Sequence, residues 1–337
     1  MNPPGQEAAA QEYVAQVLEG VPVDLQKFEK VSGRPNLVAS LPGRGERPHL
    51  VLHGHVDVVG FEGQDWDHPP LDAVVEDGVL HGRGALDMKS GVAMMCHAFA
   101  RAVADGLRPG GDVILAIVSD SETGGSAGLA YLLEEHGDLF DGAGYAVGEF
   151  GGFPLNLFGR KFYRIGVSQK QYAHLRLRLK GRSGHGSSLA TDTVVGQLGR
   201  VLAELDRMRF PYRETPVVER IIDAIAAAVP EKDQTLRSLL NADQFDGALA
   251  DLGTEGHIFE SLVRDTANPT IVSAGAKFNV IPSEATIELD ARLLPGGELD
   301  ELLDEIRSKL EGDTVMEILD TGPGGPHDFD DTLFPTL

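Results

Sequence analysis

The sequence predicts an α/β fold in which a mostly parallel sheet flanked by helices carries an inserted α+β two-layer domain. Residues 1–165 alternate short apolar strand patterns with helical patterns, as a parallel sheet covered on both faces does. Residues 166–320 change to strands that alternate apolar and charged side chains. The length of 337 residues fits about two domains.

The first part begins with an amphipathic helix over Gln6–Leu18, where Ala9, Tyr13, Val14 and Val17 recur at three- and four-residue steps. The elements expected after it are a strand at His49–His53, a helix at Ser90–Ala104, a strand at Asp112–Ser119, a helix at Ala127–Glu135 and a strand at Tyr145–Val147. Because helices separate these strands, we expect the strands to run parallel.

The second part begins with the alternating strand QYAHLRLRLKG and a helix at Val194–Met208. An acidic helical stretch, Glu214–Arg264, then reads as an insertion. The elements expected after it are strands at Thr270–Val280 and Glu284–Leu293 around a turn at Ile281–Ser283, a helix at Glu298–Leu310 and a strand at Thr314–Leu319. This β-α-β-β-α-β order predicts a two-layer module with an antiparallel sheet. Residues 321–337 would start the return to the first domain.

Charge and cysteine content limit the classes of partner. Lys and Arg number 29 against 52 Asp and Glu, a net charge of −23 that repels nucleic-acid phosphates and anionic lipid. We therefore expect no nucleic-acid and no membrane partner. The single cysteine, Cys96, cannot form an intrachain disulfide and reads as a buried thiol. The N-terminus lacks a signal-peptide pattern and no apolar run has the length of a membrane span, so a cytoplasmic location is expected.

The stretch LHGHVDVV ends the first buried strand with a histidine and an acid two residues apart. On an extended chain His55 and Asp57 face the same side, where the carboxylate can hold one ring nitrogen while the other binds a metal. His53 is a competing ligand, but it lies deeper in the strand and is expected to pack in the core.

Three further acidic residues lie in glycine-containing loops. Asp87 is in GRGALDMKSG before a helix, whereas Glu122 in SDSETGG and Glu149 in AVGEFGG each follow a strand. Because the carboxyl ends of parallel strands form one rim, His55, Glu122 and Glu149 should lie close together. Imidazole and carboxylates that converge in this way suit divalent zinc, cobalt or manganese.

These motifs, in this order, resemble those of the co-catalytic metallohydrolase family that includes acetylornithine deacetylase, succinyl-diaminopimelate desuccinylase, aminoacylase and carboxypeptidase G. The second part, with GHGS and KFNVIPSEATIELDARLLPG, resembles the lid and dimerisation domain of that family. The resemblance implies two divalent metal ions, most readily zinc, and a homodimer formed through the lid.

Individual roles follow from the same resemblance. His55 and Glu149 would bind one ion, Asp87 would bridge both ions and Glu122 would bind the second, with Asp57 orienting His55. In the lid, His185 would reach the active site of the partner subunit and help to polarise the scissile carbonyl. Asn279 and Arg292 match lid residues that contact substrate, and a guanidinium can bind a carboxylate at two points.

The chain departs from the family pattern in two places. Ser121 stands where family members usually have the glutamate that acts as general base, and a hydroxyl cannot accept a proton near neutral pH. Asp120 is adjacent but, on an extended chain, should face away from the Ser121 side. The family also supplies a last histidine ligand beyond the lid, whereas this chain ends at Leu337 and its His327 has a different setting, so a fragment or a truncated form is expected.

The resemblance therefore implies a metal-dependent hydrolase that cleaves amide bonds in N-acyl amino acids or in short peptides with a free carboxylate. The alternative is a non-catalytic or weakly active relative, because Ser121 replaces the expected base and the last metal ligand is missing.

Overall fold

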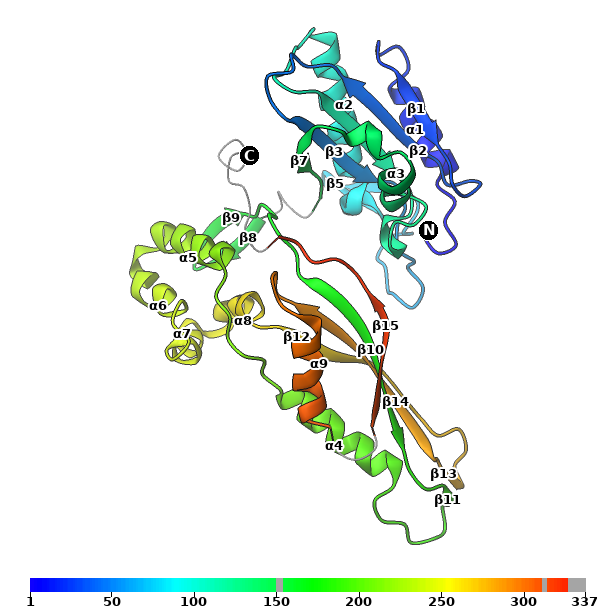
Figure 1. The fold of residues 1–337 in the computed structure, drawn as a ribbon, viewed down its shortest axis with the longest axis vertical. Helices are drawn as coiled ribbons and strands as arrows, with labels where there is room; N and C mark the ends of the chain where they lie inside the picture. The colour runs from blue at the N-terminus through cyan, green and yellow to red at the C-terminus, as the bar shows by residue number, and fades with distance from the viewer. Residues whose placement is uncertain (150–153, 311–313, 327–337) are drawn as a thin grey trace. The chain divides into compact units, whose positions relative to one another are not determined.

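The computed structural model describes residues 1–149, 154–310 and 314–326 (Figure 1). The chain forms two compact units, residues 1–150 and 151–337. Each unit has its own hydrophobic core.

A five-stranded sheet with the order β1-β2-β6-β3-β7 forms the centre of the first unit. Its strands are β1 (Leu25–Phe28), β2 (Asn36–Leu41), β3 (His49–His55), β6 (Val113–Val118) and β7 (Ala143–Val147). β6, β3 and β7 run parallel, as predicted, whereas β2 and β1 continue the sheet beside β6 as antiparallel strands. β1 and β2 were not predicted from the sequence.

Helices cover both faces of this sheet: α1 (Ala8–Val17), α2 (Ser90–Ala104) and α3 (Leu129–Glu135). The position of strand β6 in the sheet explains why its sequence, VILAIV, is apolar throughout. Leu115 and Ile117 pack in the core formed with α1 and α2, whereas Ile114, Ala116 and Val118 pack in the core formed with α3. Both faces of the strand are therefore buried, as in other parallel sheets.

The predicted buried thiol is confirmed. Cys96 on α2 is free and 2% exposed, and burial raises its pKa to about 11. A thiol with so high a pKa is almost fully protonated near neutral pH, so it is a poor nucleophile.

The second unit contains the predicted β-α-β-β-α-β module. Its antiparallel strands have the order β12-β14-β10-β15 (Figure 1). The elements are β10 (Gln171–Lys180), α4 (Val194–Arg207), β12 (Thr266–Ala274), β14 (Glu284–Leu293), α9 (Leu299–Ser308) and β15 (Val315–Thr321). Alternate residues of β10, from Ala173 to Leu179, pack in a core shared with α4 and α9. On the other face Arg176 pairs with Glu288 and Arg178 with Glu317, which explains the alternating pattern.

The acidic stretch Glu214–Arg264 is helical, as predicted. It contains α5 (Pro216–Ala228), α6 (Asp233–Ser238), α7 (Phe245–Leu252) and α8 (His257–Val263). These helices have a separate core, which also contains side chains of the hairpin β8 (Pro154–Leu157) and β9 (Arg160–Tyr163).

The strand predicted at Thr270–Val280 is wrong in its bounds. β12 starts earlier, at Thr266, and ends at Ala274, before Gly275 adopts a positive φ of 70°. The connection to β14 is longer than the predicted turn and includes β13 (Val280–Ile281), which pairs with β11 (Gly184–His185).

Among the described residues, no helix combines the length and apolar character needed to span a bilayer.

Candidate metal centre

The candidate ligands follow the carboxyl ends of the parallel strands in the first unit. His55 is the last residue of β3, Glu122 lies in a short helical turn after β6, and Glu149 follows β7 by two residues. Asp87 lies in the segment Ala85–Lys89, directly before α2, and its own backbone is extended, with φ −112° and ψ 99°. The sheet topology thus brings three loops and one helix start to the same edge.

His55 is at the centre of this arrangement. Its side chain is 2% exposed, and its Nε2 atom lies 3.3 Å from Asp87 Oδ1 and 3.4 Å from Glu149 Oε2. The ligand atoms of these three residues all lie within 4.8 Å of one another. One imidazole and two carboxylates at this spacing form a donor set that fits a divalent metal ion.

The charged groups in this cluster shift one another's pKa values. Burial alone would lower the pKa of His55, but hydrogen bonds to Asp57 and Glu149 raise it to about 10. Burial and the charge of Glu149 raise the pKa of Asp87, while the hydrogen bond from His55 lowers the pKa of Glu149. The cluster therefore favours a positive charge at its centre, which a cation would supply.

Asp57 holds the other side of the His55 ring. Nδ1 lies 3.1 Å from the Asp57 carbonyl oxygen and 3.3 Å from its carboxylate, which leaves Nε2 directed at Asp87 and Glu149. The backbone amides of Ser121 and Glu122 also donate to the Asp57 carboxylate, at 3.0 and 2.9 Å. Burial would raise the pKa of Asp57, but its hydrogen bonds outweigh burial and hold the pKa well below its usual range. Asp57 is therefore an anion that fixes the orientation of the ring.

Glu122 is near the cluster but outside the group of three. Its backbone amide is bonded to Asp57, whereas its carboxyl group is not among the ligand atoms that lie within 4.8 Å of one another. Burial, and then the charge of Asp87, raise its pKa. The Glu122 carboxylate is therefore close enough to Asp87 for the two charges to interact.

Asp120 does not lie on an extended chain, so that assumption of the sequence-based expectation is wrong. Its backbone is left-handed, with φ 66° and ψ 23°, and its carboxylate is buried. The carboxylate accepts hydrogen bonds from Thr123 Oγ1 and the Ala127 amide and pairs with Arg34 Nη2 at 3.0 Å. Burial would raise its pKa, but these donors lower it. Asp120 is therefore a structural residue of the loop that carries Ser121.

Three supporting residues were not found by sequence reasoning. Asn2 Nδ2 donates to both Asp57 and Asp120, at 2.9 and 3.0 Å. Lys89 Nζ donates to the Val56 carbonyl oxygen at 2.8 Å and so fixes the backbone between His55 and Asp57. Asn36 accepts from the Ser119 amide at 2.9 Å and holds the start of the loop after β6. Lys89 is the only one with a sequence signal, since it lies within the Asp87 motif.

The other predicted residues belong to the second unit. His185 lies in β11, is exposed, and contacts Ser187 Oγ through Nδ1 at 2.8 Å. Asn279 is exposed in the loop before β13, and Arg292 on β14 donates to Asp290 at 2.8 Å. His327 lies outside the described residues. In the first unit, His53 on β3 is half-buried rather than part of the core, and burial lowers its pKa.

Comparison with known proteins defines the class. The profile of "Peptidase family M20/M25/M40" matches residues 51–295, so the chain belongs to this family. The N-fatty-acyl-amino acid synthase/hydrolase PM20D1 of Homo sapiens is 27% identical over 294 residues, which cover 84% of this chain and 57% of that protein. The chain spans about half the length of the curated relatives it matches.

Solved structures share the fold. The di-peptidase Dug1p from Saccharomyces cerevisiae has a TM-score of 0.61 at 14% identity, covering 95% of this chain and 73% of that one. YXEP of Bacillus subtilis, described as a dinuclear metal binding peptidase, has a TM-score of 0.56 at 14% identity, covering 97% of this chain and 71% of that one.

Proposed function

We propose that the protein is a metal-dependent hydrolase of amide bonds in N-acyl amino acids or short peptides. The main support for this proposal is the orientation of the His55 ring. Its Nε2 atom faces Asp87 and Glu149, while its Nδ1 atom faces Asp57. Membership of the M20/M25/M40 peptidases and the similarity to PM20D1 support the proposal that amide bonds in these substrates are cleaved.

Two divalent ions fit this proposal. His55 and Glu149 would hold one, Glu122 would hold the second, and Asp87 would contact both. We favour zinc, with cobalt or manganese as alternatives. When bound, the ions would polarise the scissile carbonyl and acidify a water molecule.

The remaining residues prepare this site. Asp57 fixes the His55 ring with Nδ1 protonated, so that Nε2 presents its lone pair to an ion. Lys89 adds a positive charge beside the acidic cluster and holds the Val56 carbonyl.

For the second unit we propose that Asn279 and Arg292 contact the substrate, with the Arg292 guanidinium binding its carboxylate. We also propose the functional division into a catalytic part (1–165), a lid (166–320) and the start of the return (321–337). The single free cysteine supports a cytoplasmic location.

A second candidate is a non-catalytic or weakly active relative. The observation that favours it is Ser121, which lies beside the cluster where a general base is expected. Its backbone amide is used by Asp57, and its neighbour Asp120 is engaged by Arg34 and Thr123. Neither side chain supplies a free base.

The two candidates are separated by counting metal and measuring hydrolysis on the same preparation. We expect elemental analysis to count at least two ions per chain, together with release of amino acid from N-acyl amino acids or dipeptides. A chelator should abolish the hydrolysis and added metal should restore it. Substrates with an amidated carboxyl group serve as a control, since they remove the charge that Arg292 would bind. Full occupancy without hydrolysis of any substrate would favour the non-catalytic relative.

We also propose a two-fold dimer formed through the module of β10 and α4, in which His185 acts at the active site of the partner subunit. Exposure of His185 in β11, which forms a short two-stranded sheet with β13, supports this role. Sedimentation at micromolar concentration should show a dimer, the commonest oligomer. A strict monomer would refute the assembly and leave His185 without the proposed role.

A further inference from the structure

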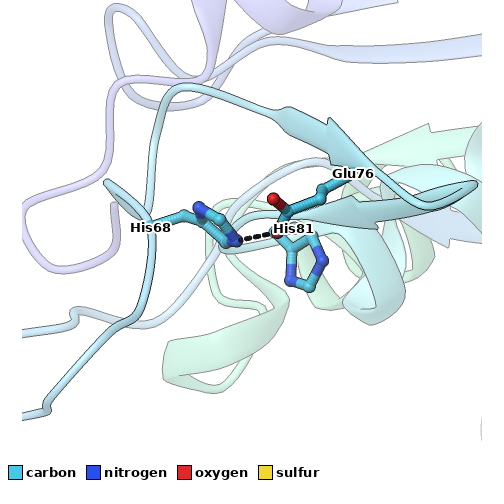
Figure 2. A group of neighbouring side chains, drawn as sticks. All are labelled: His68, Glu76 and His81. Carbon is cyan, nitrogen blue, oxygen red and sulfur yellow. Dashed lines mark ion pairs between the residues drawn. The ribbon is translucent and has the colours of Figure 1, made fainter.

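We propose that His68, Glu76 and His81 form a binding site for a single divalent transition-metal ion, best suited to zinc and separate from the candidate metal centre (Figure 2). The three residues share no ligand with the His55 cluster. The proposal is independent of the hydrolase activity.

The side chains converge in space. His68 Nε2 lies 3.2 Å from Glu76 Oε2, the contact drawn as a dashed line in Figure 2. The His68 and His81 rings have centroids 4.6 Å apart and are tilted by 56°. One ligand atom from each of the three residues lies within 4.8 Å of the other two.

A tight hairpin places two of these ligands on one face. Strands β4 (Val74–Glu76) and β5 (Val79–His81) are joined by Asp77 and Gly78, whose φ values of 49° and 78° are those of a two-residue hairpin turn. In the register, Glu76 pairs with Val79 and Val74 with His81. Because side chains alternate along a strand, Glu76 and His81 point to the same side.

The third ligand is fixed by the segment that follows it. His68 precedes Pro69 and Pro70, which restrict the backbone. The Arg83 amide donates to the Pro70 carbonyl oxygen at 2.7 Å, and the Asp72 amide donates to that of Pro69 at 3.2 Å. The backbone therefore ties the His68 segment directly to the chain two residues beyond His81, so the convergence does not depend on side-chain contacts alone.

The donor set suits zinc. Two imidazoles and one carboxylate form a ligand set that holds zinc in proteins, with metal–ligand distances of about 2 Å and water in the remaining positions. The Glu76 side chain is 62% exposed and can rotate to close the set, and the His68 side chain is 24% exposed, so an ion can enter from solvent. An ion pair between His68 and Glu76 would use only one of the two rings, whereas a metal ion uses all three side chains.

A bound ion would have a structural effect. It would cross-link the hairpin to residues 66–70, and the chain continues from His81 through Gly82–Gly84 to the segment Ala85–Lys89 that contains Asp87. Zinc at this position would hold in place the hairpin that directly precedes this segment in the chain. The expected signature is slower amide exchange across residues 74–81.

The test counts bound Zn²⁺ by equilibrium dialysis of the full chain at micromolar free metal. The wild type is compared with His81→Gln and His68→Gln, and the same substitutions are made in Asp87→Ala, which weakens the other centre. We expect each histidine variant to bind one equivalent less than its parent chain. His97→Gln, which removes an exposed histidine on α2, should bind the same number as its parent. Circular dichroism verifies that the variants fold.

Hydrogen–deuterium exchange provides a readout that is independent of the count. Zn²⁺ should slow exchange of residues 74–81 in the wild type and in Asp87→Ala, and this protection should be lost in His81→Gln. Unchanged stoichiometry in folded His68→Gln and His81→Gln would overturn the proposal, as would zinc binding without protection of the hairpin. The loss of one zinc equivalent is measured against each parent chain. The result can therefore be interpreted even if the protein hydrolyses no substrate.

Discussion

Asp87→Ala should abolish tight binding of both ions at the candidate metal centre and, with it, hydrolysis. In the proposed site Asp87 is the only ligand that serves both ions, and its carboxylate lies 3.3 Å from His55 Nε2. Loss of a residue that merely supports a ligand typically costs ~10–100-fold in metal affinity or activity, so loss of a shared ligand should cost more. His55→Ala should mainly weaken the binding of one of the two ions. Calorimetric titration with zinc measures both effects.

The matched control is Asp105→Ala, which removes an exposed aspartate at the end of α2 whose partner is Arg101. Exposed pairs of this kind contribute little to stability, so metal binding should be unchanged. If Asp87→Ala keeps wild-type affinity and stoichiometry at the His55 cluster, Asp87 is not a bridging ligand. A count that excludes the His68 site, made in the His81→Gln background, keeps that result unambiguous.

Ser121→Glu should raise turnover by ~10²–10⁴-fold, the usual contribution of a general base. The substitution places a carboxylate on the turn after β6, whose backbone is already held by the bond from the Ser121 amide to Asp57. Metal affinity should barely change, since Ser121 is not a proposed ligand. Rates are compared at saturating metal, so that occupancy is equal in the two proteins.

Ser121→Gln is the matched control for this experiment. Its side chain has the size of glutamate but no basic carboxylate, so it should not raise turnover. An equal gain in both variants would indicate a packing effect instead of proton transfer. A wild-type rate already close to that of the Glu variant, with two ions bound to each, would show that another group acts as the base.

Elements encoded by local patterns could be predicted from the sequence. Helix α2 was predicted at the observed bounds, Ser90–Ala104, because its apolar positions recur with helical spacing over fifteen residues. Strand β6 was found because a run buried on both faces is apolar throughout. The convergence of His55 and Glu149 followed from the rule that parallel strands end at one edge of a sheet, whereas Asp87 was assigned through the family resemblance.

Contacts between distant segments could not be predicted in this way. Asn2 lies 55 residues from Asp57 and 118 residues from Asp120, and no pattern near Asn2 indicates either bond. The left-handed backbone of Asp120 also lacks a signal, because non-glycine residues adopt this conformation uncommonly and the sequence does not show which donors surround the carboxylate. The supporting residues of the site therefore depend on tertiary structure, whereas the positions of His55, Glu122 and Glu149 after neighbouring strands could be read from the sequence.

The position of β7 has a consequence for how the cluster opens. His55 ends β3, which is hydrogen-bonded to strands on both sides, whereas Glu149 follows β7, the outer strand of the described sheet. Residues of β7 are largely exposed and those of β6 are almost fully buried. Outer strands open locally at a lower free energy than buried central strands. Fraying of β7 would therefore move Glu149 away while β3 keeps His55 in place, so ions can exchange through partial opening at a rate that is independent of global unfolding.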